Sequence, residues 1–153
     1  MVPAALVVER LGGDVVALAE CIAIDADAFP YPSASFAMRR ASSRVWTARR
    51  EGERRVVGFL AARLRRRGLY VQGLAVDREA RRQGVARALV RVAVDGARAE
   101  GLRELALCVG VANAAAVALY EGEGFAIVRR LRGFYPPGLY AGESDAFEMV
   151  LRV

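Results

Sequence analysis

The chain has 153 residues, 55% of them hydrophobic, so it is long enough to bury one core without disulfides. Two cysteines and no histidine argue against a disulfide framework and against a zinc site. The net charge is +6, and every basic residue is an arginine, which indicates a high-GC genome as readily as a polyanionic partner. We expect one globular domain over residues 1–153, without a bound metal.

The sequence shows neither a membrane-spanning segment nor a signal peptide. No apolar run approaches the roughly 20 residues that a membrane-spanning helix needs. Residues 1–10 lack a basic region followed by a long apolar stretch, which a signal peptide would show. The sequence therefore predicts a cytoplasmic protein without a membrane partner.

Hydrophobic periodicity and turn signals predict the elements in chain order. The first half reads as a strand at 6–9, a helix at 14–28, a short helix at 33–40 and strands at 45–49, 56–64 and 69–76. The second half reads as a helix at 84–100, a strand at 105–109, a helix at 113–121 and strands at 125–131 and 147–153. This order favours an α/β fold with hairpins, antiparallel at one end and not doubly wound.

Arginines gather at 63–67, immediately before Gly68. Three consecutive arginines before a glycine, between two apolar stretches, are typical of a solvated hairpin turn. A nucleic-acid site would need a longer basic stripe interleaved with exposed aromatic residues. We therefore do not expect a nucleic-acid partner.

A candidate anion site lies between the strand at 69–76 and the next helix. In the run Arg81-Arg82-Gln83-Gly84-Val85-Ala86, Gly84 lets the backbone approach a bulky anion and Ala86 keeps side-chain bulk away. The helix start offers free N–H groups and a positive dipole end to a pyrophosphate. Arg87 adds charge. The spacing fits neither a Walker A loop nor a dinucleotide fingerprint, and an ordinary basic helix start stays an alternative.

This run, preceded by Leu74-Ala75-Val76-Asp77, resembles the acyl-CoA-binding motif of the GNAT acetyltransferase superfamily. A second motif of that family is similar to Asn113-Ala114-Ala115-Ala116, Ala118-Leu119-Tyr120-Glu121 and Gly124-Phe125. The resemblance covers most of the chain and implies a mixed, largely antiparallel sheet flanked by helices, with acetyl-CoA as co-substrate. It implies cofactor contacts from Leu74, Ala75, Val76, Arg81, Arg82, Gln83, Gly84, Val85, Ala86, Arg87, Asn113 and Tyr120.

Asn113 and Tyr120 lie seven residues apart, about two helical turns, and so share one helix face. The resemblance implies that Asn113 hydrogen-bonds the pantetheine arm and that Tyr120 protonates the departing thiolate, which a phenol can do at neutral pH. Asn113 could equally be a plain helix cap, and Tyr120 a core aromatic residue.

Within the superfamily, the chain most resembles the ribosomal-protein alanine N-acetyltransferases and related N-terminal acetyltransferases. Ala28-Phe29-Pro30-Tyr31 resembles their substrate loop, and Phe134-Tyr135-Pro136 with Asp145-Ala146 and Met149 resembles their closing hairpin. The resemblance implies that the acceptor contacts Phe29, Tyr31, Tyr70, Phe134 and Tyr135, although the aromatic pair could simply pack within its loop.

The general base departs from the bacterial pattern. Cys108 stands where those relatives carry a glutamate, and Gly110 replaces an arginine two residues later. A cysteine is a poor base unless its pKa is shifted. Tyr70 matches a tyrosine that other N-terminal acetyltransferases use, and it could order a water that removes the proton. Tyr70 could also be a strand aromatic residue, and Cys108 an acetylated nucleophile.

The missing carboxylate favours one acceptor. Deprotonating an α-amine with a pKa of about 8 costs under ~1 kcal/mol near a pH of about 7.5, against roughly 4 kcal/mol for a lysine with a pKa of about 10.4. We therefore predict transfer of acetyl from acetyl-CoA to the N-terminal α-amine of a protein or peptide in a ternary complex. The alternatives are acetylation of a small amine or lysine side chain, and a degenerate acyl-CoA-binding module. The sequence leaves the oligomeric state open.

Overall fold

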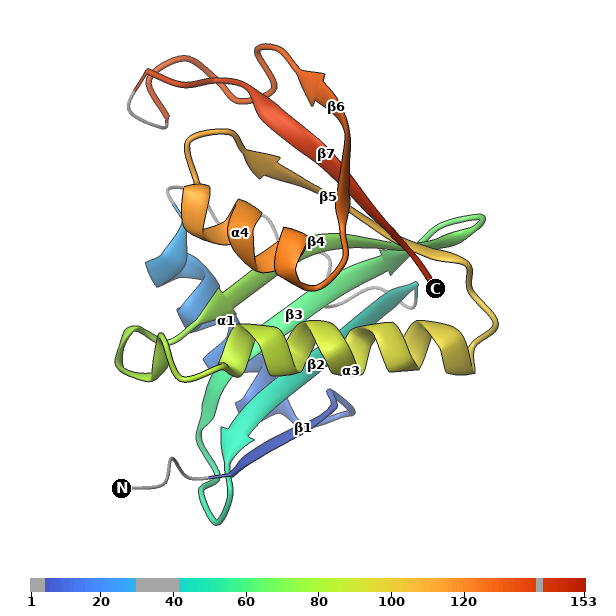
Figure 1. Cartoon of the computed structure of the whole chain (residues 1–153). Helices are drawn as coiled ribbons and strands as arrows, with labels where there is room; N and C mark the ends of the chain where they lie inside the picture. The colour runs from blue at the N-terminus through green and yellow to red at the C-terminus, as the bar shows by residue number, and fades with distance from the viewer. Residues whose placement is uncertain (1–4, 30–41, 140–141) are drawn as a thin grey trace.

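The computed structural model describes residues 5–29, 42–139 and 142–153. Within them, one seven-stranded sheet has the order β1-β2-β3-β4-β5-β7-β6. Its strands are β1 (Leu6–Arg10), β2 (Ser43–Arg50), β3 (Val56–Leu64), β4 (Gly68–Val76), β5 (Glu104–Gly110), β6 (Ala126–Leu131) and β7 (Ala146–Arg152). The helices are α1 (Val15–Ala28), α3 (Val85–Ala99) and α4 (Ala114–Gly122), with a 3-10 turn at Arg78–Ala80 (Figure 1).

The predicted α/β order is confirmed, with helix ends set by local signals. The side chain of Asp14 accepts hydrogen bonds from the backbone N–H groups of Val16 and Ala17 and so starts α1. The hairpin between β3 and β4 is the turn expected from the arginine cluster. The short helix expected at 33–40 lies outside the described residues. No described helix is long and apolar enough to cross a membrane.

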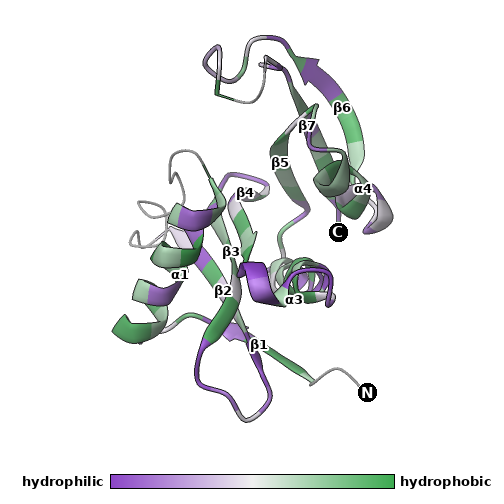
Figure 2. Cartoon of the chain, turned by 90° about the vertical axis from the view of Figure 1, so that its left-hand side faces the viewer, coloured by the Kyte–Doolittle hydropathy of each residue, from purple (hydrophilic) through white to green (hydrophobic). Residues whose placement is uncertain are grey.

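The helices cover both faces of the sheet. Figure 2 shows α1 on one side and α3 with α4 on the other. The larger buried cluster includes Trp46, Leu89 and Leu107 and lies under α3 and α4, whereas a smaller cluster around Cys21 and Phe59 lies under α1. Each helix therefore buries one apolar stripe on the sheet.

The sheet forks between β4 and β5, which form its one described parallel pair. Pairing is confined to Gly68–Tyr70 opposite Glu104–Ala106. The strands approach closely there, because a Cβ on Gly68 would lie 1.9 Å from the carbonyl oxygen of Glu104. Further along, Ala61 pairs with Gly73 but Ala62 pairs with Val71, so Gln72 is the extra residue of a β-bulge. Beyond the fork the two strands separate.

Candidate active site

A cleft of about 550 Å³ lies in the fork between β4 and β5. It is lined from both strands and from α4, with Val71, Gln72, Gly73 and Leu74 on β4, Leu107, Cys108, Val109 and Gly110 on β5, and Ala112, Asn113, Ala116 and Tyr120 beside them. Ala28, Phe29, Tyr135 and Glu143 complete it. Leu107 and Val109 belong to the face under α4, whereas Cys108 and Gly110 alternate to the opposite face. The cleft therefore passes through the sheet.

Helix α4 brings Asn113 and Tyr120 together at the cleft, as the sequence predicts. The Asn113 side-chain oxygen accepts a hydrogen bond from the backbone N–H of Ala116 at 3.2 Å, so it caps the helix with its carbonyl oxygen and not with its amide nitrogen. Tyr120 is 8% exposed, and its ring meets the edge of Phe125 at 5.5 Å. Burial, and then the nearby Tyr135, raises the pKa of Tyr120 above its usual value, which keeps the phenol protonated.

The predicted anion loop leads directly into α3. Gly84 (φ +80°) is the N-cap residue, and Arg82 also has a positive φ of 60°. Left-handed residues next to helical ones turn successive N–H groups toward one point, which forms an anion-binding concavity. A Cβ on Gly84 would meet nothing within 4 Å, so the approach to these groups is open. This geometry fits a pyrophosphate.

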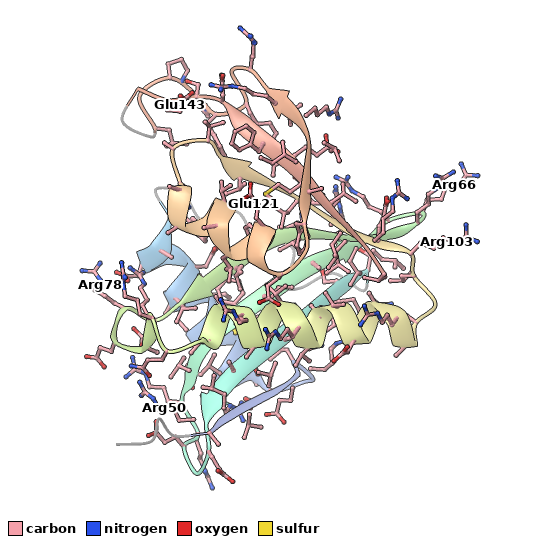
Figure 3. All side chains as sticks on the ribbon, in the orientation of Figure 1. Arg50, Arg66, Arg78, Arg103, Glu121 and Glu143 are labelled. Atoms are coloured by element: carbon pink, nitrogen blue, oxygen red, sulfur yellow. The ribbon has the colours of Figure 1, made fainter. Side chains whose placement is uncertain are left out.

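Arg81, Arg87 and Gln83 of this loop have distinct partners. The Arg81 Nε donates to the Val76 carbonyl at 3.1 Å, which ties the loop to the end of β4. The Arg87 side chain is ion-paired with Glu123 at 3.0 Å. Arg50, at the end of β2, donates to the Gln83 side-chain oxygen at 3.3 Å, and Figure 3 shows Arg50 and Arg78 on the same side of the molecule as the loop. Nothing in the sequence places Arg50 there, because the contact depends on strand pairing.

Two predicted cofactor residues are largely internal. Val85 is 2% exposed, and a Cβ on Gly58 would lie 2.9 Å from its side chain, so only the backbone of Val85 can meet a ligand. Ala75 is 5% exposed and packs under α1. Leu74, which precedes Ala75 in β4, lines the cleft. The edge of β4 that faced β5 lacks a described strand partner beyond Tyr70, so its N–H groups can bind an oxygen.

The opposite mouth of the cleft carries the predicted acceptor residues. Phe29 and Tyr135 both line it, and a Cβ on Gly110 would lie 3.6 Å from the Tyr135 ring. Phe134 does not line the cleft; it is 45% exposed and stacks edge-on against Tyr135 at 4.9 Å. Tyr31 lies outside the described residues. Glu143, labelled in Figure 3, is the charged member of the described lining and was not predicted.

Cys108 and Tyr70, the two residues considered for handling the proton of the acceptor amine, interact with each other. The Tyr70 side chain interacts with Cys108 closely enough to shift the pKa of the phenol, and Cys108 lines the cleft whereas Tyr70 does not. Burial, followed by the interaction with Cys108, raises the pKa of Tyr70 above its usual value. The Arg65 guanidinium stacks 3.8 Å from the Tyr70 ring centre. Tyr70 therefore stays neutral at physiological pH and can orient a water or the thiol but cannot act as an anionic base.

The forked sheet and its cleft are those expected of an acetyltransferase, and a comparison with known protein families agrees. The model described as the acetyltransferase (GNAT) family matches residues 7–125. Since the match spans well over half of the 153 residues, the chain belongs to the acetyltransferase (GNAT) family.

Individual relatives are similar over part of the chain. N-alpha-acetyltransferase 30 of Saccharomyces cerevisiae is 39% identical over 82 residues, covering 54% of this chain and 44% of that protein. The ribosomal protein bS18-alanine N-acetyltransferase of Escherichia coli is 40% identical over 80 residues, covering 52% and 53%. The matches thus span about half of these curated relatives.

Solved structures share the whole fold. The crystal structure of the Escherichia coli ribosomal-protein-S18-alanine N-acetyltransferase has a TM-score of 0.84 and 26% identity, covering 97% of this chain and 94% of that one. Arabidopsis thaliana NAA60 in complex with acetyl-CoA has a TM-score of 0.80 and 23% identity, covering 97% and 99%, which shows the fold alone.

Proposed function

We propose that this chain transfers acetyl from acetyl-CoA to the N-terminal α-amine of a protein or peptide, by direct attack in a ternary complex. The observation that carries the proposal is a single cleft through the sheet, with a buried phenol on one side and Phe29, Cys108 and Tyr135 on the other. Two substrates can therefore meet in it from opposite faces. Membership of the acetyltransferase family and similarity to two enzymes named for N-terminal acetylation support the same reading.

The residues present fit acetyl-CoA, which would supply an activated thioester. The backbone N–H groups that form the concavity around Gly84 would hold its pyrophosphate. The Asn113 amide nitrogen would donate to the pantetheine arm. Unpaired N–H groups of β4 near Leu74 would polarise the acyl carbonyl. Tyr120, neutral and buried, would give its proton to the departing sulfur.

The amine must arrive neutral or lose a proton at the other mouth. Tyr70 and Cys108 would hold a water that passes this proton to the solvent, because the neutral Tyr70 phenol is not suited to removing it directly. The requirement is modest for an α-amine, whose pKa of about 8 lies close to physiological pH. The cytoplasm, where acetyl acceptors of this kind are made, is the proposed location.

A direct assay tests the proposal. Purified protein is given acetyl-CoA and three matched peptides: one with a free N-terminus, one with a blocked N-terminus and an internal lysine, and one with both groups blocked. We expect release of free CoA thiol with the first alone. Turnover on the internal lysine, or on small amines tested in the same way, would show that the acceptor is not the N-terminal α-amine. Acetyl-CoA binding without any turnover would indicate a binding module.

A further inference from the structure

Gln72 lies at the point where the cleft begins. It is the bulged residue of β4, two positions beyond Tyr70, where parallel pairing with β5 stops. Cys108 is likewise two positions beyond Ala106, the β5 partner of Tyr70. Equal offsets along parallel strands place Gln72 and Cys108 on opposite lips of the fork. Both residues line the cleft.

The side-chain carbonyl of Gln72 is buried without a hydrogen bond. Its Oε1 atom is inaccessible to solvent and has no hydrogen-bond partner within the described part of the chain. An unsatisfied buried acceptor destabilises a fold, and native proteins keep such groups where a ligand or function requires them. Because Gln72 lines the cleft, a rotation of its side-chain amide that turns the oxygen toward the cleft would let a ligand there supply the missing donor.

The position of Gln72 indicates which substrate brings that donor. The residues proposed to hold acetyl-CoA lie beyond it, on the later part of β4 and on α4, as Leu74, Asn113 and Tyr120 do. Gln72 instead faces Cys108 at the amine end. An α-ammonium or α-amine carries N–H donors and needs an acceptor, and a neutral amide supplies one without raising the amine pKa as a carboxylate would.

We propose that the Gln72 side-chain carbonyl accepts a hydrogen bond from the acceptor's terminal amine and holds that amine between the two lips of the fork. This inference rests on the proposed function and deepens it. Gln72 is then a residue that positions the acceptor and selects N–H donors. Its unsatisfied state without substrate costs stability, and substrate binding removes that cost.

The test uses two variants of the full chain. Gln72→Met keeps the length and volume of the side chain but removes the strong acceptor, and Gln72→Glu keeps an acceptor. Initial rates give KM and kcat for the free-amine peptide, calorimetry gives acetyl-CoA affinity, and thermal unfolding gives Tm. Calorimetry with CoA-loaded protein also measures binding of the same peptide without turnover.

We expect Gln72→Met to raise the peptide KM by roughly 10- to 100-fold, the effect of losing a hydrogen bond to a charged group. Acetyl-CoA affinity should not change, and Tm should stay equal or rise, because a buried unsatisfied group has been removed. Gln72→Glu should keep the peptide KM within a few-fold of wild type. If Gln72 instead stabilised the fold, Gln72→Met would lower Tm.

Three results would overturn the inference: a wild-type peptide KM in Gln72→Met, a lowered Tm with both substrates affected equally, or a loss in Gln72→Glu as large as in Gln72→Met. Failure of the proposed function looks different. If the wild-type protein binds the peptide without turning it over, that function is wrong, and the Gln72→Met affinity still decides the inference. If CoA-loaded wild type binds no peptide amine, both are wrong.

Discussion

Removing one hydroxyl from Tyr120 separates chemistry from folding. Tyr120→Phe keeps the ring, and with it the edge contact to Phe125 at 5.5 Å, in a position that is 8% exposed. We expect the free energy of unfolding to change by less than about 1.5 kcal/mol. If the hydroxyl protonates the leaving sulfur, kcat should fall by roughly 10²- to 10⁴-fold, equivalent to about 2.7–5.5 kcal/mol in the barrier. Affinity for acetyl-CoA should stay near wild type.

The pH profile sharpens this prediction. Because burial raises the pKa of Tyr120 above its usual value of about 10, at least about 99% of the enzyme holds the proton at pH 8. The wild-type rate should therefore rise as the acceptor amine deprotonates, and it should show no falling limb below about pH 10. Rates are measured by CoA release at saturating peptide. Wild-type kcat in Tyr120→Phe would refute the proton-donor role, and a falling limb near pH 8 would refute the assigned pKa direction.

Further substitutions test the anion loop, the residues near the acceptor amine and the fork. Gly84→Glu should abolish acetyl-CoA binding through charge repulsion and a strained positive φ of 80°, while the far-ultraviolet spectrum stays native; unchanged affinity by calorimetry would remove the loop from the site. Tyr70→Phe should lower turnover most at low pH, where the amine is protonated, and Cys108→Ala should be mild; an inactive Cys108→Ala beside a normal Tyr70→Phe would reverse the roles. Gly68→Ala should lower Tm by roughly 4–10 °C, since its Cβ would lie 1.9 Å from a carbonyl of β5, whereas Gly122→Ala, with nothing within 4 Å, should not lower it.

Local signals account for what could be predicted of the fold. Asp14 and Asn113 cap their helices through side-chain hydrogen bonds that the sequence pattern indicates, and Gly84 begins α3 with the positive φ that a glycine permits. Helix and strand positions therefore follow from neighbours in the chain. The insertion of β7 between β5 and β6 does not, because strand order is set by long-range pairing.

The same division holds in the cleft. Tyr120, Asn113 and Cys108 sit on elements whose type and facing could be read from spacing, and each lines the cleft. Gln72 and Glu143 were missed. The role of Gln72 depends on a one-residue bulge against β3, and Glu143 reaches the cleft through the folding of the β6–β7 connection. Neither feature has a periodic or local sequence signal.

The passage through the sheet has a consequence for inhibitor chemistry. A compound that joins a peptide end to a pantetheine-like end would occupy both mouths of the cleft at once, with its linker lying between Gln72 and Cys108. Binding of one end would raise the effective concentration of the other into roughly the millimolar range, so that affinity could exceed that of either half by 10²- to 10⁴-fold. The narrowest part of such a molecule should be its middle, because the two lips of the fork are joined only a few residues away by the strand pairing at Gly68–Tyr70. Selectivity could then be placed in the peptide end, which meets the side chains of Phe29 and Tyr135.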